Sequence, residues 1–138
     1  MNILIINGPN LHNIGKREPL FYGNINFLDY LDNLRKEYSG INIDYFQSSD
    51  EGEIVETMHK KSKSLSGIVL NAGAYSHTSV AIRDAVAALE IPVVMVHISN
   101  VYARESFRHN NIIAPVCKGV ITGFGLNSYK LAMCSFLG

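Results

Sequence analysis

The chain alternates between short runs of apolar residues and longer stretches whose apolar positions recur at helical spacing. Continuous apolar runs predict strands that are buried on both faces, whereas a run that alternates apolar and polar residues predicts a half-covered edge strand. The predicted strands are residues 3–6, 41–45, 68–70, 93–96 and 120–121, of which 41–45 is the alternating one.

Between these strands, apolar residues recur every three or four positions, which predicts amphipathic helices. Gly40 is placed to end the first helix, and Thr78 or Ser79 is placed to cap the third. The predicted helices include residues 27–34, 54–58, 80–89, a short segment at 103–108, and 126–137.

Strands that alternate with helices favour an α/β fold with a parallel sheet covered on both faces. For five strands, right-handed crossovers leave few topologies, and the doubly wound order 2-1-3-4-5 is the best match. The 138 residues fit one domain, 1–138. Ligands of such folds bind at the carboxyl ends of the strands, near the switch point between strands one and three.

Polar residues follow three of the predicted strands at this edge. They are residues 7–10 after the first strand, 71–77 after the third and 97–100 after the fourth. Each has a structural explanation when taken alone: the glycines suit turns, His77 and His97 can be structural, and Ser99 can be a cap. Arg104 and Arg108 would share one exposed helix face. The joint occurrence of these glycines, histidines, serine and arginines at one edge of the sheet favours a binding site.

The composition narrows the classes of partner. Twelve basic and twelve acidic residues balance to zero net charge, so neither nucleic acid nor an anionic membrane is expected as a partner. The opening apolar run is too short to span a bilayer and lacks a basic leader, which predicts a soluble, cytoplasmic protein. Cys117 and Cys134 have no metal or redox spacing, so we expect reduced thiols and no metal site.

Other sites known on this fold are disfavoured. Asn7 and Asn71 stand where a phosphate-accepting receiver domain needs acidic residues, and no GxxxxGK[ST] loop is present. The Gly-Phe-Gly sequence at 123–125 is a weak dinucleotide signal because it lacks the third glycine and lies outside the first βα unit.

Arginine, histidine and asparagine side chains favour a small anionic, hydroxylated substrate. The candidate bases are His77, His97 and Tyr22. A tyrosine is normally a poor base at neutral pH, because its pKa is about 10. Arg17 lies on the same long loop as Tyr22, and a neighbouring cation favours the phenolate.

Several multi-residue motifs, in order along the whole chain, resemble type II 3-dehydroquinate dehydratases. The matching segments are residues 7–11, 15–19, 22–23, 71–79, 81–85, 96–100 and 103–108. The resemblance implies a flavodoxin-like fold and the dehydration of 3-dehydroquinate to 3-dehydroshikimate in the shikimate pathway. It also implies no metal, no cofactor, and a homododecamer built from trimers.

The resemblance further implies roles for individual residues. Tyr22, as phenolate, removes the proton next to the ketone, and Arg17 lowers its pKa on a lid loop at about 13–24. Asn10 holds the water that stabilises the enolate, and His97 protonates the departing hydroxyl. The substrate-binding groups are Asn71, the backbone amides of Ile98 and Ser99, His77, Arg108, Asp84 from a neighbouring subunit, and Arg104, which adds positive potential.

One departure from the family bears on the chemistry. The family commonly has a glutamate two residues before the acid histidine, where this chain has Met95. Methionine neither orients an imidazole nor raises its pKa, so we expect a weaker general acid or a substitute partner. His12 and Ser49 replace common asparagines without removing an assigned residue. Two alternatives stay open: a non-catalytic homologue that binds a small carboxylated ligand, and a flavin-binding protein.

Overall fold

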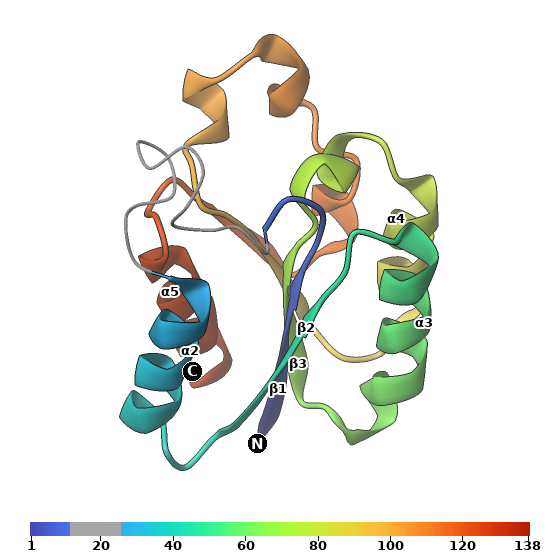
Figure 1. Cartoon of the computed structure of the whole chain (residues 1–138). Helices are drawn as coiled ribbons and strands as arrows, with labels where there is room; N and C mark the ends of the chain where they lie inside the picture. Colours follow the sequence, from blue (N-terminus) through green and yellow to red (C-terminus); the bar gives the residue numbers. More distant parts are fainter. Residues whose placement is uncertain (12–25) are drawn as a thin grey trace.

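The computed structural model describes residues 1–11 and 26–138, and its centre is a parallel sheet between two layers of helices (Figure 1). The strand order is β2-β1-β3-β4-β5, as the sequence predicts. All four neighbouring pairs are parallel. The strands are β1 (Asn2–Asn7), β2 (Asn42–Gln47), β3 (Gly67–Asn71), β4 (Val93–His97) and β5 (Gly119–Thr122).

The helices cover both faces of this sheet. In Figure 1, α2 and α5 lie on one side and α3 and α4 on the other. Their bounds are α2 (Phe27–Glu37), α3 (Glu51–Lys61), α4 (Val80–Ala88) and α5 (Asn127–Phe136). Short 3₁₀ helices complete the chain: η1 (Ser62–Ser64), η2 (Gly73–His77), η3 (Val101–Ala103), η4 (Ser106–His109) and η5 (Ala114–Val116). Among the described residues, no helix has both the length and the apolar character needed to cross a membrane.

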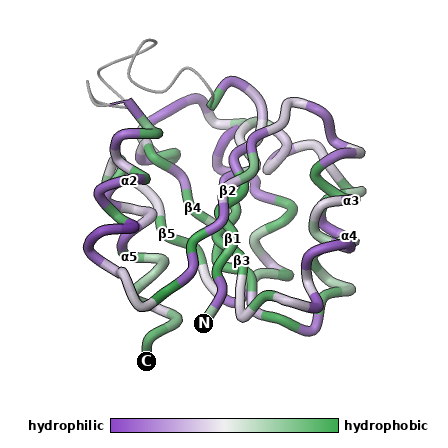
Figure 2. Tube along the Cα trace, turned by 60° about the horizontal axis from the view of Figure 1, so that its bottom comes forward, coloured by the Kyte–Doolittle hydropathy of each residue, from purple (hydrophilic) through white to green (hydrophobic). Residues whose placement is uncertain are grey.

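Two hydrophobic clusters hold the layers together, one on each face of the sheet. Along β1, Ile3 and Ile5 belong to the cluster under α2 and α5, whereas Leu4 and Ile6 belong to the cluster under α3 and α4. Successive side chains of a strand point to opposite faces, so an uninterrupted apolar run fills both clusters at once. In Figure 2, hydrophobic residues concentrate on the central strands.

Side-chain caps fix where three of the helices begin. The side chains of Asn26 and Asp50 accept hydrogen bonds from the first turns of α2 and α3. Ser79, rather than Thr78, caps α4, because its hydroxyl oxygen accepts from the Ile82 backbone N–H at 2.9 Å. These caps satisfy backbone donors that the first turn of a helix leaves unpaired.

The prediction of one short helix at 103–108 is wrong. The Asn100 side chain caps Tyr102 and starts η3 early, and the backbone of Arg104 is then extended before η4 begins. Arg104 and Arg108 therefore do not share one helix face. Two short turns with an extended break between them bring the two arginines to the same place by another route.

Candidate active site

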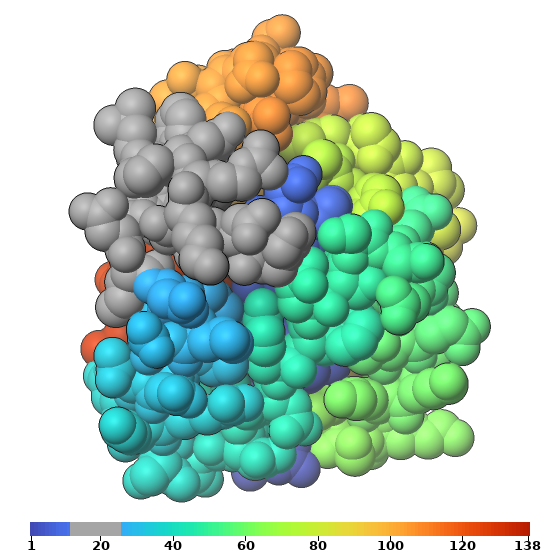
Figure 3. Space-filling model, in the orientation of Figure 1, coloured from blue at the N-terminus to red at the C-terminus, as the bar shows by residue number. Residues whose placement is uncertain are grey.

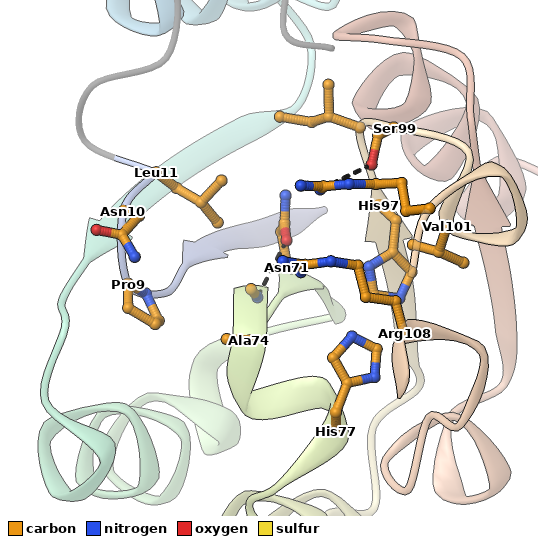
Figure 4. A pocket seen from close by; sticks show the side chains of 13 residues that line it. Pro9, Asn10, Leu11, Asn71, Ala74, His77, His97, Ser99, Val101 and Arg108 are labelled. Carbon is orange, nitrogen blue, oxygen red and sulfur yellow. Dashed lines mark hydrogen bonds between the residues drawn. The ribbon is translucent and has the colours of Figure 1, made fainter. Parts of the chain in front are cut away.

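A cavity of about 200 Å³ opens at the carboxyl ends of the central strands (Figure 4). β1 lies between β2 and β3 in the sheet, so the cavity occupies the switch point predicted for this fold. Its lining residues are Pro9, Asn10, Leu11, Asn71, Gly73, Ala74, His77, His97, Ile98, Ser99, Val101, Arg104 and Arg108. In Figure 3, the orange residues around η3 and η4 form this end of the molecule.

A buried hydrogen-bonded network fixes the floor of the cavity. The Tyr129 hydroxyl donates to Asn7 Oδ1 at 2.6 Å and accepts from Asn71 Nδ2 at 2.8 Å. Asn7 and Asn71 are register partners at the ends of β1 and β3. Burial raises the pKa of Tyr129, which keeps the hydroxyl protonated as the network requires. One helix therefore ties two strand ends together beneath the cavity.

Two histidine rings lie on one wall of the cavity. The rings of His77 and His97 are nearly parallel, with centroids 6.3 Å apart. His97 is 7% exposed, and burial, together with the nearby charge of His77, lowers its pKa to about 4. His77 Nδ1 lies 2.9 Å from the Asn110 backbone carbonyl. Because a carbonyl only accepts, this nitrogen of His77 carries a proton.

The two arginines place positive charge over the same wall. Arg104 Nη1 donates to Ser99 Oγ at 3.3 Å, and Arg108 Nε donates to Glu105 at 3.0 Å. Their side chains are largely covered, at 13% and 23% exposure. In Figure 4 the Arg108 side chain lies beside His97 and extends toward Asn71. Guanidinium groups held in this way suit a small carboxylated or hydroxylated molecule.

Asn10 turns the chain at the mouth of the cavity. Its φ of 65° is the only positive value for a residue other than glycine in the described chain. Asparagine tolerates this left-handed conformation better than most residues. The turn carries the backbone from the end of β1 across the cavity edge.

Comparison with known proteins identifies the kind of site. The family described as dehydroquinase class II matches residues 1–137. The chain belongs to this family. A 3-dehydroquinate dehydratase of Bacillus licheniformis is 50% identical over 99% of this chain and 95% of its own length. Another, from Prochlorococcus marinus, is 49% identical over 100% of this chain and 95% of its own length.

Solved structures agree with the family assignment. The type II dehydroquinase of Butyrivibrio crossotus has a TM-score of 0.94 and 45% identity, covering 100% of this chain and 98% of that one. A 3-dehydroquinate dehydratase-like protein from Bifidobacterium longum has a TM-score of 0.70 and 29% identity, covering 99% and 94%. The flavodoxin-like arrangement expected from the sequence is therefore the arrangement of this dehydroquinase family.

The dehydroquinase pocket brings together most of the residues singled out in the sequence. Those that line it are Asn10, Asn71, His77, His97, Ile98, Ser99, Arg104 and Arg108. Asp84 is exposed on α4 and is not among the lining residues of this single chain. Arg17, Tyr22 and the 13–24 loop lie outside the described residues. Within the described ranges, no group of three His, Cys, Asp or Glu side chains is placed to hold a metal ion.

Sequence reasoning missed two residues that hold side chains of this cavity in place. Tyr129 organises the floor, but in the sequence it is one tyrosine of a closing helix. Asn111 Nδ2 lies 2.9 Å from His97 Nε2 and 2.9 Å from Met95 Sδ. Met95 is fully buried on β4. The hydrogen-bond partner of the His97 ring is Asn111, in the loop after η4. Nothing in the sequence near Asn111 signals that contact.

Proposed function

We propose that the protein removes water from 3-dehydroquinate to give 3-dehydroshikimate, through an enolate and without a Schiff base. Family membership and the names of the relatives support the activity. The observation in this structure that carries the proposal is the convergence of His77, His97, Arg104 and Arg108 on one small cavity at the switch point. Cations and placed donors stabilise the oxyanion character that develops when a proton leaves the carbon next to a carbonyl.

The proposed first step is proton removal by the Tyr22 phenolate. The C–H electron pair becomes part of the enolate, and the proton ends on the tyrosine oxygen. Arg17 favours the phenolate electrostatically, and Asn10 holds the water that hydrogen-bonds the enolate oxygen. Tyr22 and Arg17 are assigned from their sequence motif, whereas Asn10 also lines the cavity.

In the proposed second step the enolate re-forms the ketone, and the C–O bond breaks with its electron pair. The departing hydroxyl takes the N–H proton of His97, on the wall of the cavity, and leaves as water. The proton that Tyr22 gained in the first step then returns to His97, which restores both groups. The backbone amides of Ile98 and Ser99, with Asn71, hold the substrate, and His77 and Arg108 bond its hydroxyls. Arg104 adds positive potential. The same groups would hold a carboxylated ligand without turnover, so binding alone does not establish catalysis.

The test is the ultraviolet absorbance of the conjugated enone that forms when purified protein meets 3-dehydroquinate. A Tyr22→Phe variant removes the proposed base, and a Tyr38→Phe variant makes the same change at a hydroxyl that contacts Cys134 near the C-terminal ends of α2 and α5. We expect the signal from the wild type and Tyr38→Phe, and none from Tyr22→Phe. Ligand binding without any signal from the wild type would favour the non-catalytic alternative.

Asp84 belongs to this proposal through a second copy of the chain. It is exposed on α4, and in the proposed dodecamer of trimers it completes a neighbouring pocket. Mixing Asp84→Asn subunits with His97→Ala subunits tests this role. Each variant alone should be inactive. In the mixture, a pocket of an Asp84→Asn subunit keeps His97 and receives Asp84 from a neighbouring His97→Ala subunit, so activity should return. A stable, fully active monomer, shown by mass in solution, would contradict it.

A further inference from the structure

The side-chain amide of Asn111 is held in one orientation. Its oxygen accepts hydrogen bonds from the backbone N–H groups of Ile113 at 3.0 Å and Ala114 at 2.9 Å. In a flipped amide the NH₂ group would face these two backbone N–H groups. Donors would then face donors, and none of the three groups would have an acceptor. The NH₂ group therefore faces the other way, toward Met95 Sδ and His97 Nε2.

This orientation determines which nitrogen of His97 carries the proton. An amide NH₂ group only donates, so His97 Nε2 must accept through its lone pair. In the neutral ring the proton is then on Nδ1. A second proton, on Nε2, would face the Asn111 NH₂ group across 2.9 Å with no acceptor between them.

His97 borders two cavities. His97 lines the dehydroquinase pocket, and it also lines a smaller cavity of about 80 Å³. Asn111 lines only the smaller one. Nε2 is thus committed to the Asn111 side, and Nδ1 remains for the pocket that holds the proposed substrate.

We propose that Asn111 is a positioning residue that holds His97 as a neutral imidazole with its proton on Nδ1. The action of that N–H on the departing hydroxyl rests on the proposed function, whereas the state of the ring does not. Asn111 thereby gives the histidine ring a donor for a partner, whose effect is opposite to that of a carboxylate. A carboxylate accepts from the ring and favours the charged form, and an amide donor favours the neutral form.

The charges around His97 act in the same direction. His77 faces the ring from η2, Arg104 and Arg108 line the same pocket, and His109 lines the smaller cavity. No carboxylate is among the described residues that line either cavity, and the two arginines are permanent cations, which disfavour a charged ring beside them. Met95, from β4 itself, contributes only a weakly accepting thioether.

The state of the ring is measured by ¹⁵N NMR of protein with labelled histidine side chains, in the solid state so that a large assembly is no obstacle. A His97→Gln variant identifies the resonances of His97. In the wild type near pH 7 we expect a protonated Nδ1 and an unprotonated Nε2. A protonated Nε2 would overturn the proposal, and this measurement needs neither substrate nor a folded Asn111 variant.

Asn111→Asp provides the second arm. It keeps the oxygen that accepts from Ile113 and Ala114 but replaces the donor that faces His97 with an acceptor. We expect the midpoint of His97 protonation, followed by its nitrogen resonances against pH, to move to higher pH by at least about one pH unit, since a carboxylate within hydrogen-bond distance favours the charged ring. The acid limb of the kcat/KM profile should move to higher pH.

Asn42→Asp is the matched control. It makes the same change of charge on an exposed side chain where β2 begins, away from the carboxyl ends of the strands. We expect it to leave the His97 nitrogen resonances and the acid limb as in the wild type. If Asn111→Asp leaves the midpoint of His97 protonation unchanged, or if Asn42→Asp has the same effect as Asn111→Asp, the contact with Asn111 does not set the state of the ring.

Discussion

His77 and His97 face each other with nearly parallel rings, and their centroids lie 6.3 Å apart. Two imidazoles at this separation disfavour double protonation, because the second charge must form beside the first. The His77 ring is oriented by the Asn110 carbonyl and the His97 ring by the Asn111 amide. Adjacent residues of one loop therefore set the state of both histidines, although the histidines follow different strands.

Folding stability should fall in mild acid because of His97. Unfolded, this histidine takes up a proton near its ordinary pKa of 6.5, whereas in the folded protein its pKa is about 4. Between these values the unfolded state binds more protons, so the free energy of unfolding falls as the pH falls, by up to about 3 kcal/mol. The measurement is Tm against pH for the wild type and His97→Asn.

The variant should show a shallower loss of Tm between about pH 6.5 and pH 4. His59→Asn is the control for the loss of one histidine, because His59 is exposed on α3. Equal slopes in all three proteins would mean that His97 takes up its proton as readily in the folded state as in the unfolded chain.

Tyr129→Phe should destabilise the protein and disturb the floor of the pocket. The lost hydroxyl serves Asn7 and Asn71 at once, and both asparagines are buried. Leaving buried amide groups without a partner costs about 1–3 kcal/mol. Urea unfolding measures the change, with Tyr38→Phe as the control, whose hydroxyl contacts Cys134. A loss no larger than that of the control would show that the network does not stabilise the floor.

The sequence was informative wherever a pattern reports on its own neighbourhood. The uninterrupted apolar run at 3–6 predicts a strand buried on both faces, because successive residues of a strand point to opposite faces of the sheet. The polar strand ends predict the pocket, because parallel strands end at one edge. The segment 103–108 was mispredicted because the Asn100 cap and the extended backbone at Arg104 interrupt the helical spacing.

Contacts between residues that lie far apart along the chain could not be predicted from the sequence. Asn111 lies 16 residues from Met95 and 14 from His97 along the chain, and only the course of the loop brings it to both. With Met95 in the chain, the sequence predicts either a weaker general acid or a substitute partner for His97, and it does not indicate that Asn111 contacts the ring. The role of Tyr22 stays a prediction from its motif.

Gly8→Ala should weaken the junction between β1 and β3. A Cβ at position 8 would lie 2.7 Å from the Ala72 backbone oxygen and 2.9 Å from its carbonyl carbon. Backbone cannot move aside as a flexible side chain does, so the strand ends must separate, at a cost of about 1–3 kcal/mol. The urea midpoint and kcat/KM should both fall.

Gly40→Ala is the matched control for this change. No atom lies within 4 Å of a Cβ at position 40, in the turn after α2. The same added methyl group should therefore leave the urea midpoint and the activity close to the wild-type values. If Gly8→Ala behaves like Gly40→Ala, the close approach at Ala72 does not constrain the edge of the pocket.

Arg108→Ala should weaken substrate binding more than it changes the fold. The Arg108 side chain lies over the pocket, held by Glu105 at 3.0 Å, and its guanidinium group presents a fork of donors. Loss of a charged, largely covered donor costs on the order of 2 kcal/mol of binding, so KM for 3-dehydroquinate should rise by at least about tenfold. Arg108→Lys keeps the charge without the fork, so its KM should lie between those of the wild type and Arg108→Ala.

Lys60→Ala is the control. It removes a positive charge on the exposed face of α3, far from the pocket, and should leave KM unchanged. If Arg108→Ala and Lys60→Ala had the same KM, Arg108 would act on the pocket only through its general potential.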